Sequence, residues 1–233
     1  MKIVILTGAG ISAESGIKTF RDHDGLWEGH DVHEVATPEG WNKNPPLVLD
    51  FYNQRRAQLL EVEPNKAHFI INELQDQHEV VVITQNVDDL HEKAGNQKVI
   101  HLHGELNKVR CTICAKVQRW EVSLNIGDHC ECDGQLRPHI VWFGEAVPML
   151  EKAVIECSDA HVAIVVGTSM QVYPAAGLVG YLPLDCKLYY VDPKPSINYE
   201  LAQMKSRLQV FDETATEGLP KVVEIILQEK GSS

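Results

Sequence analysis

Four cysteines carry the most specific chemical signal in this 233-residue sequence. Cys111 and Cys114 are separated by two residues, and Cys130 and Cys132 follow as a second pair. Paired thiolates of this kind are typical of a structural zinc site, whose four protein ligands leave no open position for catalysis. The second pair is one residue closer than usual, so His129 is an alternative fourth ligand. We predict one structural zinc ion, with Cys130 preferred over His129.

A glycine-rich segment near the N-terminus indicates phosphate binding. Gly8, Gly10 and Ala13 match the G-x-G-x-x-G/A fingerprint directly after the apolar run 3–6. Glycines there let the backbone approach a pyrophosphate, whose charge is met by amides at a helix N-terminus. In a hydride-transfer enzyme an acidic residue would end a second strand about 20 residues later. The acidic residues at that distance follow no predicted strand, so we expect a dinucleotide to bind in another way.

His103 is the candidate general base. It follows the apolar run 99–102 and precedes Gly104. Ligands gather at strand ends in α/β sheets, and a histidine that titrates near neutrality is suited to proton transfer. A lone histidine is more often structural, so position alone does not decide its role. Side chains alternate along a strand, and His101 is therefore predicted to be the structural member of the two.

The elements that must position these residues alternate along the chain. Short apolar runs rich in β-branched residues lie at 3–6, 80–84, 99–102, 162–166 and 188–191. Such continuous runs suit parallel strands that are buried on both faces. Helical patterns lie at 66–74, 149–157 and 219–227. This alternation predicts an α/β fold with a Rossmann-like, doubly wound parallel sheet.

Two stretches interrupt this alternation. Residues 23–64 contain tryptophans, prolines and one helical pattern near 46–60 but no convincing strand, which predicts a helical insertion. Residues 107–139 contain the four cysteines and few core residues, which predicts a zinc module. We expect one domain over 1–233, with the sheet core drawn from about 1–22, 65–106 and 140–229.

Composition narrows the choice of partner and compartment. The net charge is −12, which disfavours duplex nucleic acid and suits a cationic partner such as a lysine-bearing peptide. No apolar run approaches the roughly 20 residues that span a bilayer. The apolar run at the N-terminus is too short for a signal peptide, so we expect the protein in the cytoplasm and not in a membrane.

Together these motifs resemble the sirtuins, a family of NAD-dependent protein deacylases. The similar segments cover nearly the whole chain in one order: 8–17, 19–21, 85–88, His103–Gly104, the cysteines, 141–145 and 167–169. The resemblance implies a Rossmann-like domain, a small zinc module, and NAD as co-substrate bound with an acyl-lysine peptide in the cleft between them. It further implies that the products are nicotinamide, free lysine and O-acyl-ADP-ribose.

The resemblance also implies roles for individual residues. His103 would deprotonate a ribose hydroxyl, and Asn86 and Asp88 would complete the catalytic group. The implied NAD contacts are Gly8, Ala9, Gly10, Ile11, Ser12, Ile17, Phe20, Arg21, Gln85, Asn86, Asp88, Gly167, Thr168, Ser169, Asp192 and Ala215. Val141, Phe143 and Gly144 would pair with the substrate backbone. Asp192 stands where the family usually has asparagine, and Ala215 is a loose match, so the adenosine contacts are the least constrained.

Tyr52 and Arg55 suggest which acyl group is removed. They lie three residues apart in the predicted helix and therefore share one helix face, as Tyr52 and Arg56 also would. A phenol and a guanidinium together can bind a carboxylate, although a Tyr-x-x-Arg spacing alone more often marks a solvated helix face. Within the family, the pattern is similar to the acyl pocket of desuccinylating members and selects Arg55. We expect removal of acetyl and succinyl groups, with Arg56 outside the pocket.

Two other functions are compatible with parts of this pattern. Mono-ADP-ribosyl transfer and NAD hydrolysis would use the same fold and cofactor. A zinc-ribbon binding module with a degenerate α/β domain would need only the cysteines. The acidic charge and the set Gln85, Asn86, Asp88 and His103 favour an enzyme, and the Tyr-x-x-Arg pair favours deacylation.

Overall fold

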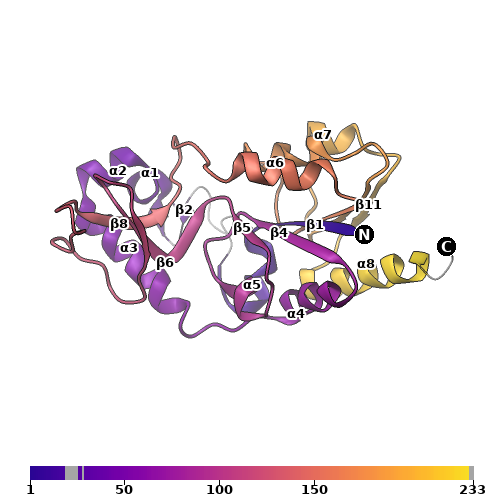
Figure 1. Cartoon of the computed structure of the whole chain (residues 1–233), viewed down its shortest axis with the longest axis horizontal. Coiled ribbons are helices and arrows are strands. Elements are labelled where there is room, and N and C mark those ends of the chain that lie inside the picture. The colour runs from indigo at the N-terminus through magenta and orange to yellow at the C-terminus, as the bar shows by residue number, and fades with distance from the viewer. Residues whose placement is uncertain (19–25, 28, 231–233) are drawn as a thin grey trace.

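The computed structural model describes residues 1–18, 26–27 and 29–230, and Phe20 and Arg21 lie outside them. Six parallel strands form the main sheet in the order β11-β10-β9-β1-β4-β5 (Figure 1). They are β1 (Lys2–Thr7), β4 (Glu79–Thr84), β5 (Val99–His101), β9 (Val162–Val166), β10 (Lys187–Val191) and β11 (Leu208–Phe211). The predicted doubly wound α/β fold is confirmed. The strand β11 was not predicted, because it lies at the sheet edge and lacks a continuous apolar run.

Helices cover both faces of this sheet. On one face lie α4 (Lys66–Glu73) and α8 (Ala215–Lys230), and on the other lie α6 (Leu150–Ser158) and α7 (Tyr199–Ala202) (Figure 1). Alternate residues of β1 therefore enter two different cores: Ile3 and Ile5 pack toward α4 and α8, whereas Val4 and Leu6 pack toward α6. Burial on both faces explains why the central strands are continuous apolar runs.

The strand order reverses beside β1. From β1 the chain proceeds outward to β4 and β5, and it later returns to β9 on the other side of β1 before β10 and β11. Ligands of open α/β sheets bind at such a switch point, outside the carboxyl ends of the strands. The topology thus places the binding crevice between the ends of β1 and β9.

A smaller lobe stands beside the carboxyl edge of the sheet (Figure 1). It combines the antiparallel strands β6 (Gly104–Cys111), β7 (Val117–Arg119) and β8 (Leu136–Ile140) with α1 (Val32–Val35), α2 (Pro38–Lys43) and α3 (Pro45–Gln58). The helix predicted near 46–60 is confirmed as α3. The expectation of no strand in 23–64 is wrong, because β2 (Leu26–Trp27) pairs with β3 (His30–Asp31). Two residues per strand are too few for a hydrophobic period to be visible in the sequence.

Helix α3 organises the small lobe. Asn44 caps it by accepting a hydrogen bond from the amide of Leu47, and prolines occupy its first turn. Phe51 and Tyr52 enter one apolar cluster, while Leu49 enters a second cluster that includes Cys111 and Cys130. The helix is therefore buried on more than one side and holds the two parts of the lobe together.

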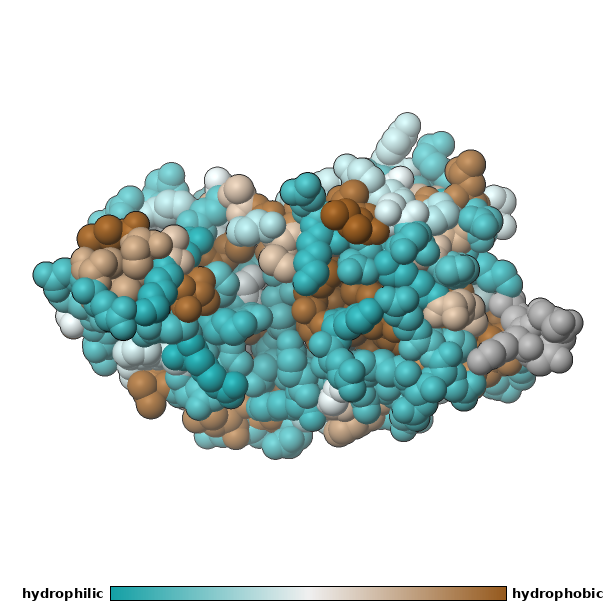
Figure 2. Space-filling view, in the orientation of Figure 1, coloured by the Kyte–Doolittle hydropathy of each residue, from teal (hydrophilic) through white to brown (hydrophobic). Residues whose placement is uncertain are grey.

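The surface agrees with the composition. Most of the face seen in Figure 2 is hydrophilic, and hydrophobic residues collect near its centre. Among the described residues, no helix has both the length and the apolar character needed to cross a membrane.

The cap of α4 also holds the glycine-rich segment. The Asn65 side chain accepts from the amide of Ala67 and donates to the Ile11 carbonyl at 2.7 Å. His68 completes this capping box, and its buried ring meets the ring of His91 edge-on at 4.9 Å. Through Asn65, the start of one helix is thus bonded to the first turn after β1.

Burial of His68 makes stability depend on pH. Burial lowers the pKa of His68 to about 4. In the unfolded chain the pKa of a histidine is about 6.5. As the pH falls from that value toward 4, the unfolded state therefore takes up the proton first. The free energy of unfolding decreases over this range. In His68→Gln an amide can still fill the capping-box position but takes up no proton. The decrease measured by urea unfolding should be shallower in the variant; parallel curves for the two proteins would contradict this.

Candidate active site

A cleft of about 550 Å³ opens between the lobes at the switch point. Its volume is in the range of small-molecule sites. Most of the predicted site residues line it, namely Gly8, Ala9, Gly10, Ile17, Gln85, Asn86, Asp88, His103, Val141, Phe143, Gly144, Gly167, Thr168, Ser169 and Asp192. Ile11, Ser12, Tyr52, Arg55 and Ala215 lie outside its lining. Segments far apart in the sequence therefore converge on one cavity.

The floor of the cleft is a contact between two glycine loops. The amide of Gly8 donates to the Val166 carbonyl at 3.1 Å, and that of Gly10 donates to the Gly167 carbonyl at 2.8 Å. A Cβ at Gly10 would lie 2.7 Å from the Gly167 Cα, and Gly167 itself has φ +60. The sequence motif predicts that these glycines make room for a pyrophosphate. The structure shows that the close approach of the two loops already requires them.

A hydrogen-bonded group lies behind this floor. The Ser12 hydroxyl donates to Asp88 Oδ2 at 3.0 Å and accepts from Asn86 Nδ2 at 3.1 Å. Burial raises the pKa of Asp88 to about 6, although the Leu90 amide and the Ser12 hydroxyl oppose the shift. Ser12 thus holds two cleft residues in place without lining the cleft itself.

His103 is held in one protonation form by the backbone. Its Nδ1 lies 2.9 Å from the Gln85 carbonyl. Because a carbonyl only accepts, Nδ1 carries the proton and Nε2 of the neutral ring is the basic nitrogen. Burial lowers the pKa of His103, and the carbonyl bond opposes this only partly. In the described part of the chain, no group forms a hydrogen bond to Nε2.

His101 has the opposite environment. Its Nδ1 donates to the Asn86 carbonyl at 3.1 Å, and its Nε2 lies 2.7 Å from the Glu92 carboxylate. Burial alone would lower the pKa of His101, but the hydrogen bond and charge of Glu92 outweigh it and raise the pKa. His101 does not line the cleft. Its contacts agree with the structural role that strand alternation predicted.

Tyr52 and Arg55 lie beside the cleft. Tyr52 is fully buried, and its hydroxyl accepts a hydrogen bond from Trp142 Nε1 at 3.0 Å. Arg55 packs over Phe51, with its guanidinium carbon 4.3 Å from the ring centroid. It lines a small cavity of about 40 Å³ whose other walls include Trp27 and Asp88, which also line the main cleft.

Arg56 lies outside the cleft, as expected, but it is a structural residue. It is 3% exposed, its Nε donates to the Leu106 carbonyl at 2.9 Å, and its Nη1 donates to Asn53 Oδ1 at 2.7 Å. The bond to Leu106 joins α3 to β6, whereas the bond to Asn53 lies within α3. Arg56 is therefore unsuitable as an inert control for Arg55.

Sequence reasoning missed several wall residues. Trp27 comes from β2, which carries no strand signal of its own. Glu14 lies in the glycine-rich segment and accepts from the amide of Thr216 at 3.1 Å, which ties that segment to the start of α8. At this end Thr214 lines the cleft, whereas Ala215 is buried in the core beside it. An acidic side chain within the motif was the only sequence signal for Glu14.

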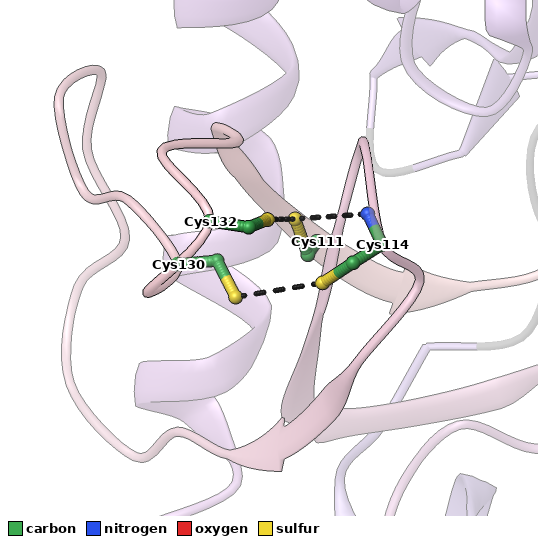
Figure 3. Close-up of side chains that lie close together, drawn as sticks. All are labelled: Cys111, Cys114, Cys130 and Cys132. Atoms are coloured by element: carbon green, nitrogen blue, oxygen red, sulfur yellow. Dashed lines mark hydrogen bonds between the residues drawn. The ribbon is translucent and has the colours of Figure 1, made fainter.

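The four cysteines converge as predicted (Figure 3). Their sulfurs all lie within 4.8 Å of one another, with Cys111 to Cys132 at 3.4 Å and Cys114 to Cys130 at 3.7 Å. A tetrahedral site with Zn–S bonds of about 2.3 Å needs sulfurs roughly 3.8 Å apart, so the set fits structural zinc. His129 lies outside this cluster, with Nδ1 3.6 Å from the Asp133 carboxylate. This favours Cys130 as the fourth ligand.

Comparison with known proteins gives a consistent result. A model described as the Sir2 family matches residues 8–174. A Helicobacter pylori protein named NAD-dependent protein deacylase is 55% identical, over 96% of this chain and 98% of its own. A Bacteroides thetaiotaomicron protein of the same name is 46% identical, over 97% of each chain.

Solved structures agree in fold. One described as a Sir2 homolog–NAD complex is 39% identical with a TM-score of 0.86, and covers 98% of this chain and 90% of that one. A Sir2 complex with an inhibitor, 2′-O-acetyl-ADP-ribose and a deacetylated peptide is 31% identical with a TM-score of 0.76, over 99% and 94% of the two chains.

The cysteine geometry predicts that metal supports the fold. The purified protein should contain about one zinc per chain by elemental analysis. Cys130→Ser should lose most of this zinc and lower the Tm by roughly 5–10 °C, because metal binding is coupled to folding. His129→Ala should retain both zinc and Tm. Zinc retention in Cys130→Ser together with zinc loss in His129→Ala would instead assign the fourth ligand to His129.

Proposed function

The chain belongs to the Sir2 family and is an NAD-dependent protein deacylase, and we propose that His103 is its general base and that Arg55 and Tyr52 admit acidic acyl groups. The first proposal rests on one observation: His103 lines the cleft, and its Nε2 is the basic nitrogen of the ring. The floor of the same cleft is formed by the two glycine loops. Two relatives named NAD-dependent protein deacylase, 55% and 46% identical over nearly the full chain, support deacylation as the reaction class.

The cleft is suited to NAD in size and in donor chemistry. Ala9 and the hydroxyl-bearing Thr168 and Ser169 line it above the glycine floor, and the amides of Gln85 and Asn86 line the side nearest the base. When bound, NAD supplies a ribose carbon that exchanges nicotinamide for the acyl oxygen. We propose that these residues hold the phosphates and the two riboses, with Asp192 at the adenosine end.

The base would act through one defined nitrogen. The Gln85 carbonyl keeps the proton on Nδ1, so Nε2 is available to accept a proton from a ribose hydroxyl. Burial keeps the ring neutral near pH 7 by lowering its pKa. Asn86 and Asp88, held by Ser12, lie at the same end of the cleft and support the position of the ribose.

The edge at 141–144 is proposed to bind the peptide. Its backbone is tied to the base, because the amide of Val141 donates to the His103 carbonyl at 2.9 Å. The amide of Phe143 donates to the Ala36 carbonyl at 2.9 Å, which ties the edge to the small lobe. The Phe143 side chain is 49% exposed in the cleft and could cover the aliphatic part of an acyl-lysine.

Acidic acyl groups would reach the small cavity beside the cleft. Arg55 lines that cavity and supplies the positive charge. Burial raises the pKa of Tyr52 well above its usual value, so the hydroxyl keeps its proton and can donate. A buried carboxylate is stabilised by such a pair, whereas an acetyl group needs neither partner.

Acylated protein lysines are the proposed partners of the cleft. The solved Sir2 complex that contains a deacetylated peptide supports this choice over ADP-ribosyl transfer to other groups or hydrolysis of NAD alone. The cytoplasmic location and the lack of nucleic-acid binding stay predictions that rest on sequence and charge.

Replacement of the base should abolish most turnover. His103→Ala should reduce kcat for deacylation by about 10²–10⁴ without unfolding the protein, as loss of a general base does. The wild-type rate should fall only below pH 6.5, because burial lowers the pKa of His103 and protonation removes the base. His33→Ala, at an exposed helical histidine, is the matched control. A folded His103→Ala enzyme with near wild-type kcat would refute the assignment.

Replacement of Arg55 should change acyl preference. The ratio of kcat/KM on succinyl-lysine to kcat/KM on acetyl-lysine peptide should fall by roughly 10–150-fold in Arg55→Met, because a charge-assisted hydrogen bond is lost. Tyr52→Phe should act in the same direction but more mildly.

Lys43→Met is the control for net charge, since Lys43 is an exposed cation at the end of α2. Arg56→Met should instead lower the Tm, because it removes the buried hydrogen bond between α3 and β6. An unchanged ratio in Arg55→Met, with the fold intact, would show that Arg55 does not contact the acyl group.

A further inference from the structure

A buried hydrogen bond joins the peptide edge to the acyl pocket. The indole Nε1 of Trp142 donates to the Tyr52 hydroxyl at 3.0 Å, and the two side chains are 2% and 0% exposed. Trp142 lies between Val141 and Phe143, whereas Tyr52 lies on α3, so the bond connects residues 90 positions apart. An indole N–H donates and never accepts, so the phenol oxygen must be the acceptor.

The direction of this bond limits where the proton of the Tyr52 hydroxyl can point. Since the oxygen accepts from Trp142, its own proton must point elsewhere. Within residues 1–18, 26–27 and 29–230, no group accepts that proton. Leaving a buried donor without an acceptor is destabilising. A ligand with an acceptor at this position would remove that cost.

The indole is itself held firmly in place. The Arg137 guanidinium carbon stacks 3.2 Å from the centroid of the Trp142 ring. Arg137 donates to both Glu145 oxygens, at 2.7 and 3.1 Å, and the Trp142 amide donates to Glu145 Oε2 at 2.8 Å. Arg110 adds a further bond to Glu145 at 2.9 Å. The ring position and the backbone position of Trp142 thus depend on the same carboxylate.

We propose that Trp142 is a positioning residue for acyl specificity: by donating to the Tyr52 oxygen, it directs the Tyr52 proton toward the carboxylate of an acidic acyl group. This inference rests on the proposed role of Tyr52 and Arg55. An acetyl group has no carboxylate and gains nothing from the oriented proton. The indole N–H of Trp142 therefore acts through Tyr52, and this hydrogen bond contributes only when the acyl group is acidic.

The test compares the same ratio of succinyl to acetyl kcat/KM in a double-mutant cycle. Trp142→Phe removes the indole donor and should lower the ratio by about 3–10-fold, as loss of a neutral hydrogen bond does. In a Tyr52→Phe background the same change should leave the ratio unaltered, because the hydroxyl is already absent. Trp41→Phe is the matched control, since Trp41 packs against Trp142 with ring centroids 5.8 Å apart but donates no described hydrogen bond to Tyr52.

A second variant separates the hydrogen bond from packing. Placing 3-benzothienylalanine at position 142 keeps the shape of the ring and removes only the N–H, so it should lower the ratio even if Trp142→Phe folds poorly. An equal loss on both peptides, or a lower ratio that persists in the Tyr52→Phe background, would overturn the inference. If Arg55→Met lowers the ratio while the position 142 variants do not, only this inference fails. If none of the variants changes the ratio, the proposed acyl pocket fails as well.

Discussion

The approach of two glycine loops at the switch point is the contact on which the rest of the site depends. Gly8 and Gly10 follow β1 and meet Gly167 after β9 so closely that a Cβ at any of them would overlap neighbouring atoms. This contact forms the cleft floor and brings the first turn after β1 against the end of β9. The switch-point topology makes it possible, because β1 and β9 are adjacent although far apart in sequence.

Gln85 extends this arrangement from the floor to the base. Its side chain donates to the Thr168 hydroxyl at 2.9 Å, and its carbonyl accepts from His103 Nδ1 at 2.9 Å. One residue after β4 therefore connects the end of β9 with the group proposed to move the proton. From His103 the chain of bonds continues to Val141, so the floor, the base and the peptide edge share one backbone framework.

Burial sets the protonation of the groups around this framework, and each partner modifies the result. His101 is buried and His103 is half-buried, yet their pKa values shift in opposite directions because only His101 meets a carboxylate. Burial keeps the pKa of Asp88 raised, to about 6, despite two hydrogen bonds. Tyr52 keeps its proton in an interior where Arg55 and Trp142 stand close by. The direction of each pKa shift is thus set by the surroundings of the group: the two histidines share one residue type but shift in opposite directions.

The sequence by itself determined the features that depend on neighbours along the chain: the apolar runs of the central strands, the glycine loop, the cysteine spacing and helix α3. It also indicated His103, because a strand end and a following glycine are local signals. Only the tertiary structure decided that β11 joins the sheet edge, that Arg56 is buried and that Trp142 bonds to Tyr52. The physical reason is that burial and hydrogen-bond partners at these positions come from distant segments, and neither propensity nor periodicity records which segments meet.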